Sequence, residues 1–357
     1  MIRVLKLFPS KSKNIISTRY ELKGELRVFS SGNHVERHRI VVTYNTHPEA
    51  IKILEEVGEV VISKRLITSE EELVELARDA DALMVVKSVE PVTERVIENA
   101  PRLRIIARVG VGYDNVDVRA ATRRGIWVTI APVNSVAVAE HTLALIFSLA
   151  RKIPLLDRHA RSGLWYRSLG TPQNLMGVDL WGKVLGIIGL GRVGREVALR
   201  ARCLGMKILY YDIVRRKDLE EQLGIEFKNL EDLLRESDFV SIHTPLTEET
   251  RYMIDEEELR LMKPTAYLVN TSRGAVINTK ALVRALKEGW IAGAALDVFE
   301  EEPLPPDNEL TRLDNVILTP HAASYTAETS RKLAVTAAEE IIRVLRGDKP
   351  LYPVNRE

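Results

Sequence analysis

Short apolar runs alternate with amphipathic stretches from residue 40 onwards. Each run holds three to five residues rich in Val, Ile or Leu, and the stretches between them have the spacing of helices with one apolar face. The runs lie at 40–44, 60–62, 82–86, 103–107 and 126–129, with helices predicted at 48–57, 69–78 and 93–99. Strands that alternate with helices predict parallel pairing and a layered α/β fold.

A long apolar segment at 136–151 separates this series from a second one. The segment is predicted to be a helix, and glycines and prolines between 152 and 180 then interrupt the alternation. Further strands are predicted at 184–188, 207–211, 239–242, 266–269, 291–296 and 316–318, and a last helix at 327–345. Two such series predict two doubly wound, Rossmann-like α/β domains with a cleft between them.

The composition is that of an ordinary folded protein with little net charge. The 357 residues are 45% apolar and 28% charged, and the formal net charge is +1. No global field therefore favours nucleic acid or an acidic membrane. The segment 136–151 is too short to span a bilayer, and the first nine residues lack a signal-peptide core. We expect a cytoplasmic protein without nucleic-acid or membrane partners.

Two single-residue counts add to this description. Cys203 is the only cysteine, which excludes an intrachain disulfide and a metal site built mainly from thiolates, so no metal is expected. We expect Cys203 to pack inside the fold. Gln occurs only at positions 173 and 222, while Lys, Arg and Glu are abundant, a bias typical of proteins from hyperthermophiles.

Residues 1–39 differ from the rest of the chain. They carry nine cationic and three anionic side chains and show no sustained period. We interpret them as a basic N-terminal extension, either an accessory hairpin or a tail before the first domain. An anion-binding arm is the alternative.

A glycine-rich turn follows the strand at 184–188. Gly189, Gly191 and Gly194 form a Gly-x-Gly-x-x-Gly motif, with Arg192 and Val193 between the last two, and a helix is predicted from 195 to 204. A strand, this turn and a helix in that order predict a dinucleotide site, because the backbone can approach a pyrophosphate at the helix N-terminus.

Asp212 ends the next strand, where the dinucleotide motif needs a carboxylate for the ribose hydroxyls. The charge of Asp212 favours NAD over NADP, because a 2′-phosphate would lie against it. Arg215 and Arg216 follow closely and could accept such a phosphate, so NADP stays possible.

Three late segments lie beyond the ends of predicted strands and carry candidate catalytic groups. Reduction of a ketone needs a proton donor at the oxygen, and His321 is a residue type that titrates in the right range. A carboxylate such as Glu302 can orient an imidazole and stabilise its charged form. Arg273 can bind a carboxylate through two parallel hydrogen bonds.

These segments, the glycine-rich turn and the loop 109–117 together resemble the D-isomer-specific 2-hydroxyacid dehydrogenases. The resemblance covers about residues 40–357, and several motifs agree in order and spacing. It is strongest to the branch that holds D-3-phosphoglycerate dehydrogenase and glyoxylate or hydroxypyruvate reductase. It implies hydride transfer between a nicotinamide cofactor and a small D-2-hydroxy acid or its 2-oxo partner.

The resemblance also implies roles for individual residues. Arg273 corresponds to the arginine that binds the substrate carboxylate and 2-oxygen, Glu302 to the partner of the catalytic histidine, and His321 to the general acid and base. Glu300 and Glu301 are rivals of Glu302, and the spacing before Pro303 favours Glu302. The amides of Val111 and Gly112 correspond to the loop that holds the substrate carboxylate. The remaining cofactor contacts implied are Thr244, Thr271, Ser272, Asp297 and Ser324.

Lys87 and Ser88 correspond to a substrate-binding loop of phosphoglycerate dehydrogenases, in which a cation and a serine meet a phosphate. Lys87 could also bind the hydroxyl of hydroxypyruvate, or be a solvated lysine at a strand end. Of the other histidines, we interpret His141 as structural and His243 as packing, with a place at the adenine end as the alternative.

The resemblance predicts how the domains are assembled. A flavodoxin-like substrate domain would comprise 40–136 and 325–357, and an NAD-binding Rossmann domain would comprise 137–324. The segment 140–180 is similar to the dimerisation arm of the family, so a homodimer is expected. An NAD-sensing dimeric scaffold or corepressor of the same fold is the alternative function, and a methyltransferase that uses the glycine-rich turn would leave the late segments unexplained.

Overall fold

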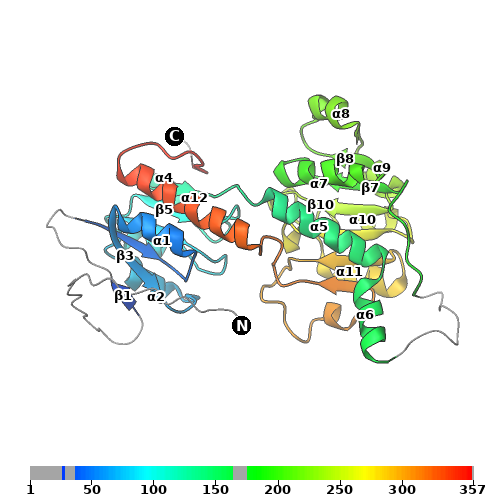
Figure 1. Cartoon of the computed structure of the whole chain (residues 1–357), viewed down its shortest axis with the longest axis horizontal. Coiled ribbons are helices and arrows are strands. Elements are labelled where there is room, and N and C mark those ends of the chain that lie inside the picture. Colours follow the sequence, from blue (N-terminus) through cyan, green and yellow to red (C-terminus); the bar gives the residue numbers. More distant parts are fainter. Residues whose placement is uncertain (1–25, 29–36, 164–174, 356–357) are drawn as a thin grey trace, which may run out of the picture.

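The structure of the chain, a computed structural model, describes residues 26–28, 37–163 and 175–355. Two lobes lie side by side, and each is built on one sheet with helices on both faces (Figure 1). All strand pairs except β1 with β3 are parallel. The predicted α/β class with two doubly wound sheets is confirmed.

The first lobe contains a six-stranded sheet in the order β1-β3-β2-β4-β5-β6. Its apolar strands are covered on both faces, as parallel sheets require. Its elements are β1 (Leu26–Val28), β2 (His38–Val42), α1 (Pro48–Glu55), β3 (Gly58–Ser63), α2 (Glu70–Ala77), β4 (Ala82–Val85), α3 (Glu94–Glu98), β5 (Ile105–Arg108), α4 (Val118–Arg123) and β6 (Trp127–Thr129).

The last helix of the chain, α12 (Ala327–Leu345), returns to this first lobe (Figure 1). Its small and branched face, formed by Ala334, Ala337, Ala338 and Ile341, is buried against the strands and α1. The chain therefore crosses between the lobes twice, once before α5 (Ser135–Ala150) and once before α12.

The second lobe contains a seven-stranded sheet in the order β13-β12-β11-β10-β7-β8-β9. Helix α5 packs on it beside α7. The other elements are α6 (Ile153–Arg161), β7 (Val184–Ile188), α7 (Arg192–Cys203), β8 (Lys207–Tyr211), α8 (Lys217–Leu223), β9 (Glu226–Phe227), α9 (Leu230–Glu236), β10 (Phe239–Ile242), α10 (Glu256–Leu261), β11 (Tyr267–Asn270), η3 (Gly274–Val276), α11 (Thr279–Glu288), β12 (Gly293–Leu296), η4 (Glu309–Arg312) and β13 (Val316–Leu318).

Part of the basic N-terminal extension belongs to the first sheet. Leu26–Val28 pairs antiparallel with β3 at the sheet edge, so the extension reaches the sheet through one short strand. The prediction that regular structure starts at residue 40 was two residues late, because β2 begins at His38. The remaining residues of the extension up to 36 lie outside the described residues.

One helix start in the second lobe was predicted wrongly, and one helix was not predicted. The helix after the glycine-rich turn begins at Arg192 rather than 195, so Gly194 lies in its first turn. The segment 152–180, predicted to interrupt the alternation, contains α6. Pro154 lies in the first turn of α6, where a missing N–H leaves no hydrogen bond unmade.

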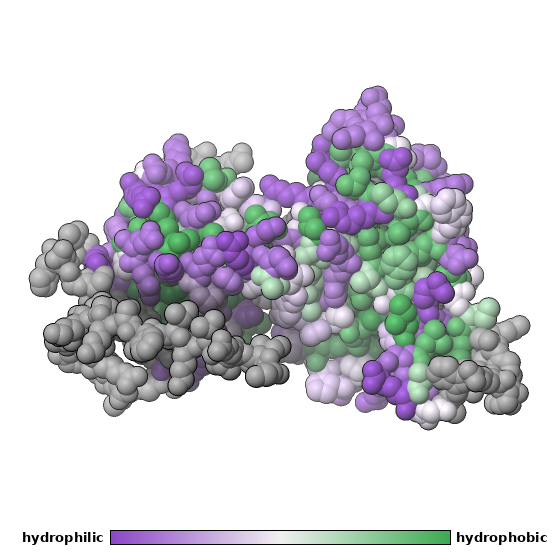
Figure 2. Space-filling view, viewed as in Figure 1, coloured by the Kyte–Doolittle hydropathy of each residue, from purple (hydrophilic) through white to green (hydrophobic). Residues whose placement is uncertain are grey.

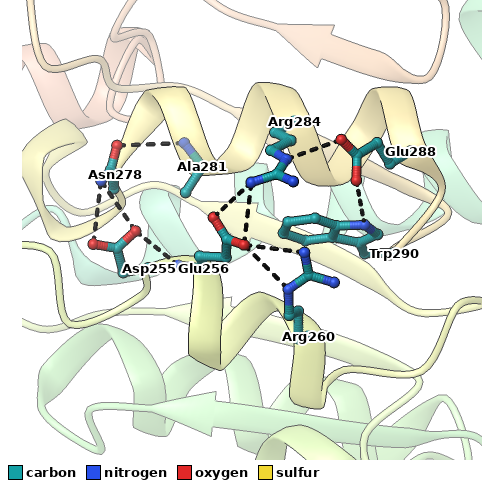
Figure 3. Close-up of polar contacts among 8 residues, drawn as sticks. All are labelled: Asp255, Glu256, Arg260, Asn278, Ala281, Arg284, Glu288 and Trp290. Carbon is teal, nitrogen blue, oxygen red and sulfur yellow. Dashed lines mark hydrogen bonds and ion pairs between the residues drawn. The ribbon is translucent and has the colours of Figure 1, made fainter.

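A cluster around Trp290 joins α10 to α11 on the surface (Figure 3). The guanidinium carbon of Arg260 lies 3.6 Å from the centroid of the Trp290 ring, and that of Arg284 lies 5.3 Å away. Glu256 accepts hydrogen bonds from both arginines, and Glu288 accepts one from the Trp290 indole at 3.1 Å. Cation–π contacts and ion pairs share the same side chains, which ties the two helices together.

Candidate functional site

The carboxyl ends of the parallel strands in the second sheet bring distant parts of the chain to one edge. The glycine-rich turn follows β7, Asp212 follows β8, and Thr271 follows β11. Asp297 follows β12, and the segment with His321 follows β13. This edge is where open α/β sheets bind ligands.

A cleft of about 1000 Å³ opens between this edge and the first lobe. Both lobes supply its walls: Lys87, Ser88, Val111 and Gly112 come from the first lobe. From the second sheet and the segment that follows it come Thr271, Arg273, Asp297, Glu302, His321 and Ser324. The structure thus brings together, in one cleft, ten of the residues that the sequence singled out.

His321 and Glu302 form a close pair at the cleft. Nδ1 of His321 lies 2.7 Å from Oε2 of Glu302, whose other oxygen accepts the backbone N–H of Phe299 at 3.0 Å. The rival Glu300 instead accepts hydrogen bonds from the Thr279 backbone and the Tyr252 hydroxyl. Since Nδ1 donates to a carboxylate, Nε2 is the ring nitrogen left for a substrate.

The environment keeps Glu302 ionised. Burial opposes the charge, but the hydrogen bond from His321, together with the nearby charges of His321 and Arg273, holds the pKa of Glu302 below its usual value. A charged carboxylate behind the imidazole stabilises the imidazolium form and fixes the ring orientation.

The backbone of His321 adopts a left-handed conformation, with φ of 51°. Such a conformation is unfavourable for a residue with a Cβ and needs support from the surrounding structure. The support comes from Asp297: its backbone oxygen accepts the His321 N–H at 2.8 Å, and its carboxylate accepts the N–H groups of Ala322 and Ala323.

Arg273 reaches across the cleft to the first lobe. Its Nε donates to Oδ2 of Asp114 at 2.9 Å, and Nη1 donates to the backbone oxygen of Ser272 at 2.8 Å. A Cβ on Gly112 would lie 1.8 Å from Nη2 of Arg273, so the guanidinium fits there because residue 112 is glycine. The ion pair with Asp114 was not predicted, because the two residues are far apart in the chain.

The loop that contains Val111 and Gly112 presents free donors to the cleft. Within the described part of the chain, neither backbone N–H has a hydrogen-bond acceptor, while the neighbouring Gly110 oxygen is held by the Ala131 N–H at 2.8 Å. Two unpaired amides beside an arginine can accept a carboxylate.

Two buried charged residues of the first lobe, Arg108 and Glu90, were not predicted as part of the site. They hold the backbone of the loops that carry Lys87 and Gly112. Arg108, 4% exposed, donates to the backbone oxygens of Val85, Lys87 and Gly112. Glu90, fully buried, accepts the N–H of Lys87 at 2.8 Å, and burial raises its pKa. The only signal in the sequence was a pair of charged residues next to apolar strand ends.

Lys87 lines the cleft and lies near two aromatic rings. Its Nζ is 5.6 Å from the ring centroid of Tyr44 and 5.8 Å from that of Tyr325. Ser88 and Tyr325 line the same cleft. A cation and hydroxyl groups there can contact a polar substituent of a substrate.

The glycine-rich turn fits a dinucleotide. Gly189 has φ of 93°, and a Cβ on Gly194 would lie 2.1 Å from the Gly189 oxygen, so both positions need glycine for the turn and its packing. A Cβ on Gly191 would meet nothing within 4 Å, which leaves open space above the first turn of α7. Arg192 and Val193 begin that turn, whose N–H groups have no partners within the helix and can bind phosphates.

Asp212 lies beside this turn and holds it. Its carboxylate accepts the N–H of Leu190 at 2.7 Å and that of Val214 at 3.2 Å. Arg215 is paired with Glu220, and Arg216 with Asp218, each through two nitrogens. Both arginines therefore have a local carboxylate partner.

The other residues assigned to the cofactor lie in different surroundings. The Thr271 hydroxyl is 2.9 Å from that of Thr142 on α5, at the floor of the cleft. Ser272 and Thr244 lie outside the cleft lining. Ser272 contacts Oδ1 of Asn270 through its backbone N–H and its hydroxyl, and the Thr244 hydroxyl faces the sulfur of Met253 at 3.9 Å.

Two further expectations concern single residues away from the cleft. Cys203 was expected to pack inside the fold, and this was wrong: it is the last residue of α7 and is exposed, with its thiol 3.5 Å from the Leu199 oxygen. His243 follows β10, and burial lowers its pKa to about 3, in keeping with a packing role. Its Nε2 lies 2.8 Å from the Ser241 hydroxyl.

No group of three or more His, Cys, Asp or Glu side chains in the described ranges is arranged to hold a metal ion. In the same ranges no helix is both long and apolar enough to cross a membrane.

Comparison with known proteins defines the class. Residues 143–323 match the D-isomer specific 2-hydroxyacid dehydrogenase, NAD binding domain. Over 321 residues the chain is 49% identical to a glyoxylate reductase of Korarchaeum cryptofilum, covering 89% of this chain and 96% of that one.

Solved structures of similar proteins have the same fold over most of the chain. A protein from Thermus thermophilus superimposes with a TM-score of 0.82 at 39% identity, over 89% of this chain and all of that one. The NADPH-dependent glyoxylate/hydroxypyruvate reductase of Sinorhizobium meliloti, in complex with NADP and malonate, gives a TM-score of 0.78 at 32% identity, over 89% and 97% of the two chains.

The chain belongs to the D-isomer specific 2-hydroxyacid dehydrogenase family. It is an oxidoreductase that acts on the CH–OH group of a 2-hydroxy acid, with NAD or NADP as its cofactor.

Proposed function

We propose that the chain reduces glyoxylate or hydroxypyruvate by hydride transfer from NADH or NADPH. The observation that carries the proposal is that the His321–Glu302 pair and Arg273 line one cleft, to which both lobes contribute residues. The glyoxylate reductase of Korarchaeum cryptofilum, which is 49% identical to this chain over 321 residues, supports the choice of substrate.

Arg273 and the amides of Val111 and Gly112 bind the substrate in this proposal. The guanidinium meets the carboxylate and the 2-oxygen, and the two amides complete the carboxylate site. Since Nε of Arg273 is already paired with Asp114, Nη2 beside Gly112 is the edge that faces the substrate.

His321 supplies the proton. When bound, the reduced nicotinamide provides the hydride that adds to the 2-carbon. The Nε2 proton of His321 goes to the 2-oxygen as charge develops there, and the Glu302 carboxylate stabilises the imidazolium before that transfer. In the oxidative direction His321 accepts the same proton.

The remaining assignments follow the same arrangement. Gly189, Gly191, Arg192, Val193 and Gly194 would hold the pyrophosphate. Asp212 would bind the ribose, and Thr244, Thr271, Ser272, Asp297 and Ser324 would complete the cofactor site. In this scheme 40–136 with 325–357 form the substrate domain, and 137–324 the cofactor domain.

A phosphorylated substrate, 3-phosphohydroxypyruvate, is the second candidate. It is favoured by the place of Lys87, which lines the cleft together with Ser88. A phosphate on C3 of the substrate, two carbons from the carboxylate carbon, would need such a cation.

A substrate panel tests the proposal. Oxidation of NADH and NADPH should be followed with glyoxylate, hydroxypyruvate and 3-phosphohydroxypyruvate. We expect turnover with glyoxylate and hydroxypyruvate. A preference for the phosphorylated acid that is lost in Lys87→Met would favour the second candidate. Cofactor binding without turnover of any 2-oxo acid would contradict the proposal and favour a cofactor-sensing scaffold.

We further propose that the protein is a homodimer. Apolar side chains are exposed on one face of the second lobe, over α5, α6 and α7 (Figure 2). Among the described residues from 135 to 203, the large apolar side chains that are exposed are Val136, Phe147, Ile153, Leu156, Met176, Val178, Trp181 and Leu199. An exposed apolar patch of this kind marks a protein interface, and a second copy of the chain can cover it symmetrically.

A further inference from the structure

A chain of polar side chains runs beneath the segment that carries His321 and joins it to α5. Nε2 of His141, on α5, lies 3.1 Å from the Thr319 hydroxyl, which donates to Oδ1 of Asp297 at 2.6 Å. Nε2 of His141 is also 3.6 Å from that carboxylate oxygen. Neither His141 nor Thr319 lines the cleft, whereas Asp297 does.

The hydrogen bonds determine where the protons lie. The Thr319 hydroxyl has one proton, and its short contact with a carboxylate oxygen uses that proton. The hydroxyl must therefore accept from His141, so Nε2 of His141 carries a proton. Helix α5 thus donates, through one ring and one hydroxyl, to the carboxylate of Asp297.

Asp297 in turn holds the backbone around His321. Its side chain is fully buried, and its two oxygens accept the N–H groups of Ala322 and Ala323 at 2.8 and 2.9 Å. The same segment includes the left-handed backbone of His321. A carboxylate without other partners could turn and release these amides, and the donors from Thr319 and His141 oppose that.

We propose that His141 is a positioning residue, which fixes the Asp297 carboxylate through Thr319 and so holds His321 in its reactive place. The expected loss of kcat rests on the proposed function, whereas the expected change in exchange of the Ala322 and Ala323 amides does not. It assigns to His141 a role beyond the packing of α5.

The test compares His141→Leu, which removes the donor, with His141→Gln, whose amide can replace Nε2–H. Glu140→Gln serves as the matched control, because Glu140 is the preceding residue of α5, is exposed and is 3.8 Å from Arg200. Two measurements are made: amide hydrogen exchange in the peptide 318–324 of the protein without substrate, and kcat, KM and the NADH dissociation constant with glyoxylate.

We expect faster exchange at Ala322 and Ala323 in His141→Leu and wild-type exchange in the other two variants. We expect kcat to fall about ten- to a hundred-fold in His141→Leu, as for a misplaced catalytic group, and the loss of NADH affinity to be smaller than the loss of kcat. His141→Gln should recover most of that loss.

Unchanged exchange and kcat in His141→Leu would overturn the inference, as would equal losses in the Leu and Gln variants. If His141→Leu does not fold, Thr319→Val against Thr319→Ser makes the same comparison. A wild-type protein that turns over no 2-oxo acid would remove the proposed function, and the exchange data would still decide the role of His141.

Discussion

At the scale of single residues, His321 has a side chain that is proposed to transfer a proton and a backbone in the unfavourable left-handed conformation. Its ring is oriented by Glu302 at 2.7 Å, and its backbone is held by Asp297. The side chain and the backbone thus depend on two different carboxylates. Loss of Glu302 should affect proton transfer more than cofactor binding, whereas loss of Asp297, a proposed cofactor contact, should affect both.

His321→Ala should remove most turnover. General acid catalysis contributes about 10² to 10⁴ in rate, and we expect kcat to fall in that range. NADH binding, measured by fluorescence titration, should stay within about two-fold of wild type, because the ring would act on the substrate oxygen rather than on the cofactor. Near-normal kcat in the variant would refute the assignment.

The preference for NADH over NADPH should depend on Asp212. Its charge opposes a 2′-phosphate, and Arg215 and Arg216 are engaged by Glu220 and Asp218. We expect Asp212→Asn to raise the ratio of kcat/KM for NADPH to that for NADH by about ten-fold, or ~1.4 kcal/mol. Lys217→Gln, a neighbouring charge change, is the control. A wild-type preference for NADPH would show that the arginines exchange partners and bind the phosphate.

The candidate catalytic residues could be predicted from the sequence, but the contacts that hold them and the neighbouring loops in place could not. Motif spacing singled out Arg273, Glu302 and His321, which the structure places at one cleft. The pairing of Arg273 with Asp114, and of Arg108 with the loop backbones, depends on contacts between distant parts of the chain. A single sequence contains no local pattern for such contacts.

At the scale of elements, apolar periodicity predicted strands well and helix starts less well. The apolar run 82–86 corresponds to strand β4, Ala82–Val85. Such strands are recognisable because a parallel strand buried on both faces is a continuous apolar run. The start of α7 was placed three residues late, because the glycines of the turn continue into its first turn. Helix α6 was missed, because its proline, Pro154, and its charged residues are also typical of a loop.

His243, which follows β10, should make the free energy of unfolding sensitive to acid. Because burial lowers the pKa of His243 to about 3 from its usual 6.5, the unfolded chain binds a proton between those pH values that the folded chain does not. The free energy of unfolding should therefore fall as the pH drops through this window and be highest above it.

Urea denaturation at about pH 7 and about pH 4.5 measures this effect. From about pH 7 to about pH 4.5, the free energy of unfolding should fall less in His243→Gln than in wild type. The difference between the two proteins at the higher pH gives the effect of the substitution on packing. Equal losses in the two proteins would show that His243 is protonated in the folded state.

The cluster around Trp290 should stabilise the contact of α10 with α11. We expect Trp290→Ala to lower the free energy of unfolding by ~1–2 kcal/mol, since two cation–π contacts are removed, and Trp290→Phe to lower it by less. Chemical denaturation of the three proteins checks this. Equal stability of Trp290→Ala and wild type would show that the cluster contributes nothing.

At the scale of the whole molecule, two sheets with opposed edges form the cleft, and α5 contacts both the cleft and the exposed apolar face. Its Thr142 reaches Thr271, while its Phe147 is 37% exposed on the other side. The two-lobed α/β architecture followed from two alternating series in the sequence. The return of α12 to the first lobe could not be deduced from periodicity, which carries no information on which sheet a helix covers.

The homodimer predicts a concentration-dependent mass. Light scattering should give twice the chain mass of 40.3 kDa, and Phe147→Asp with Trp181→Asp should shift the protein toward monomer. A charge buried in an apolar interface is strongly unfavourable. As a control, Leu351→Asp places a charge on an exposed apolar residue of the other lobe and should leave the dimer intact. A wild-type monomer would contradict the dimer.

In the proposed function, His321, Glu302 and Arg273 act together on one substrate at the nicotinamide. A crystal structure with bound NAD and the unreactive 2-oxo acid analogue oxamate tests it most directly. We predict Nε2 of His321 within about 3 Å of the 2-oxygen, with Arg273 on the carboxylate and the lobes closed. A closed complex in which the His321 ring lies away from both the nicotinamide and the 2-oxygen would show that His321 does not transfer the proton.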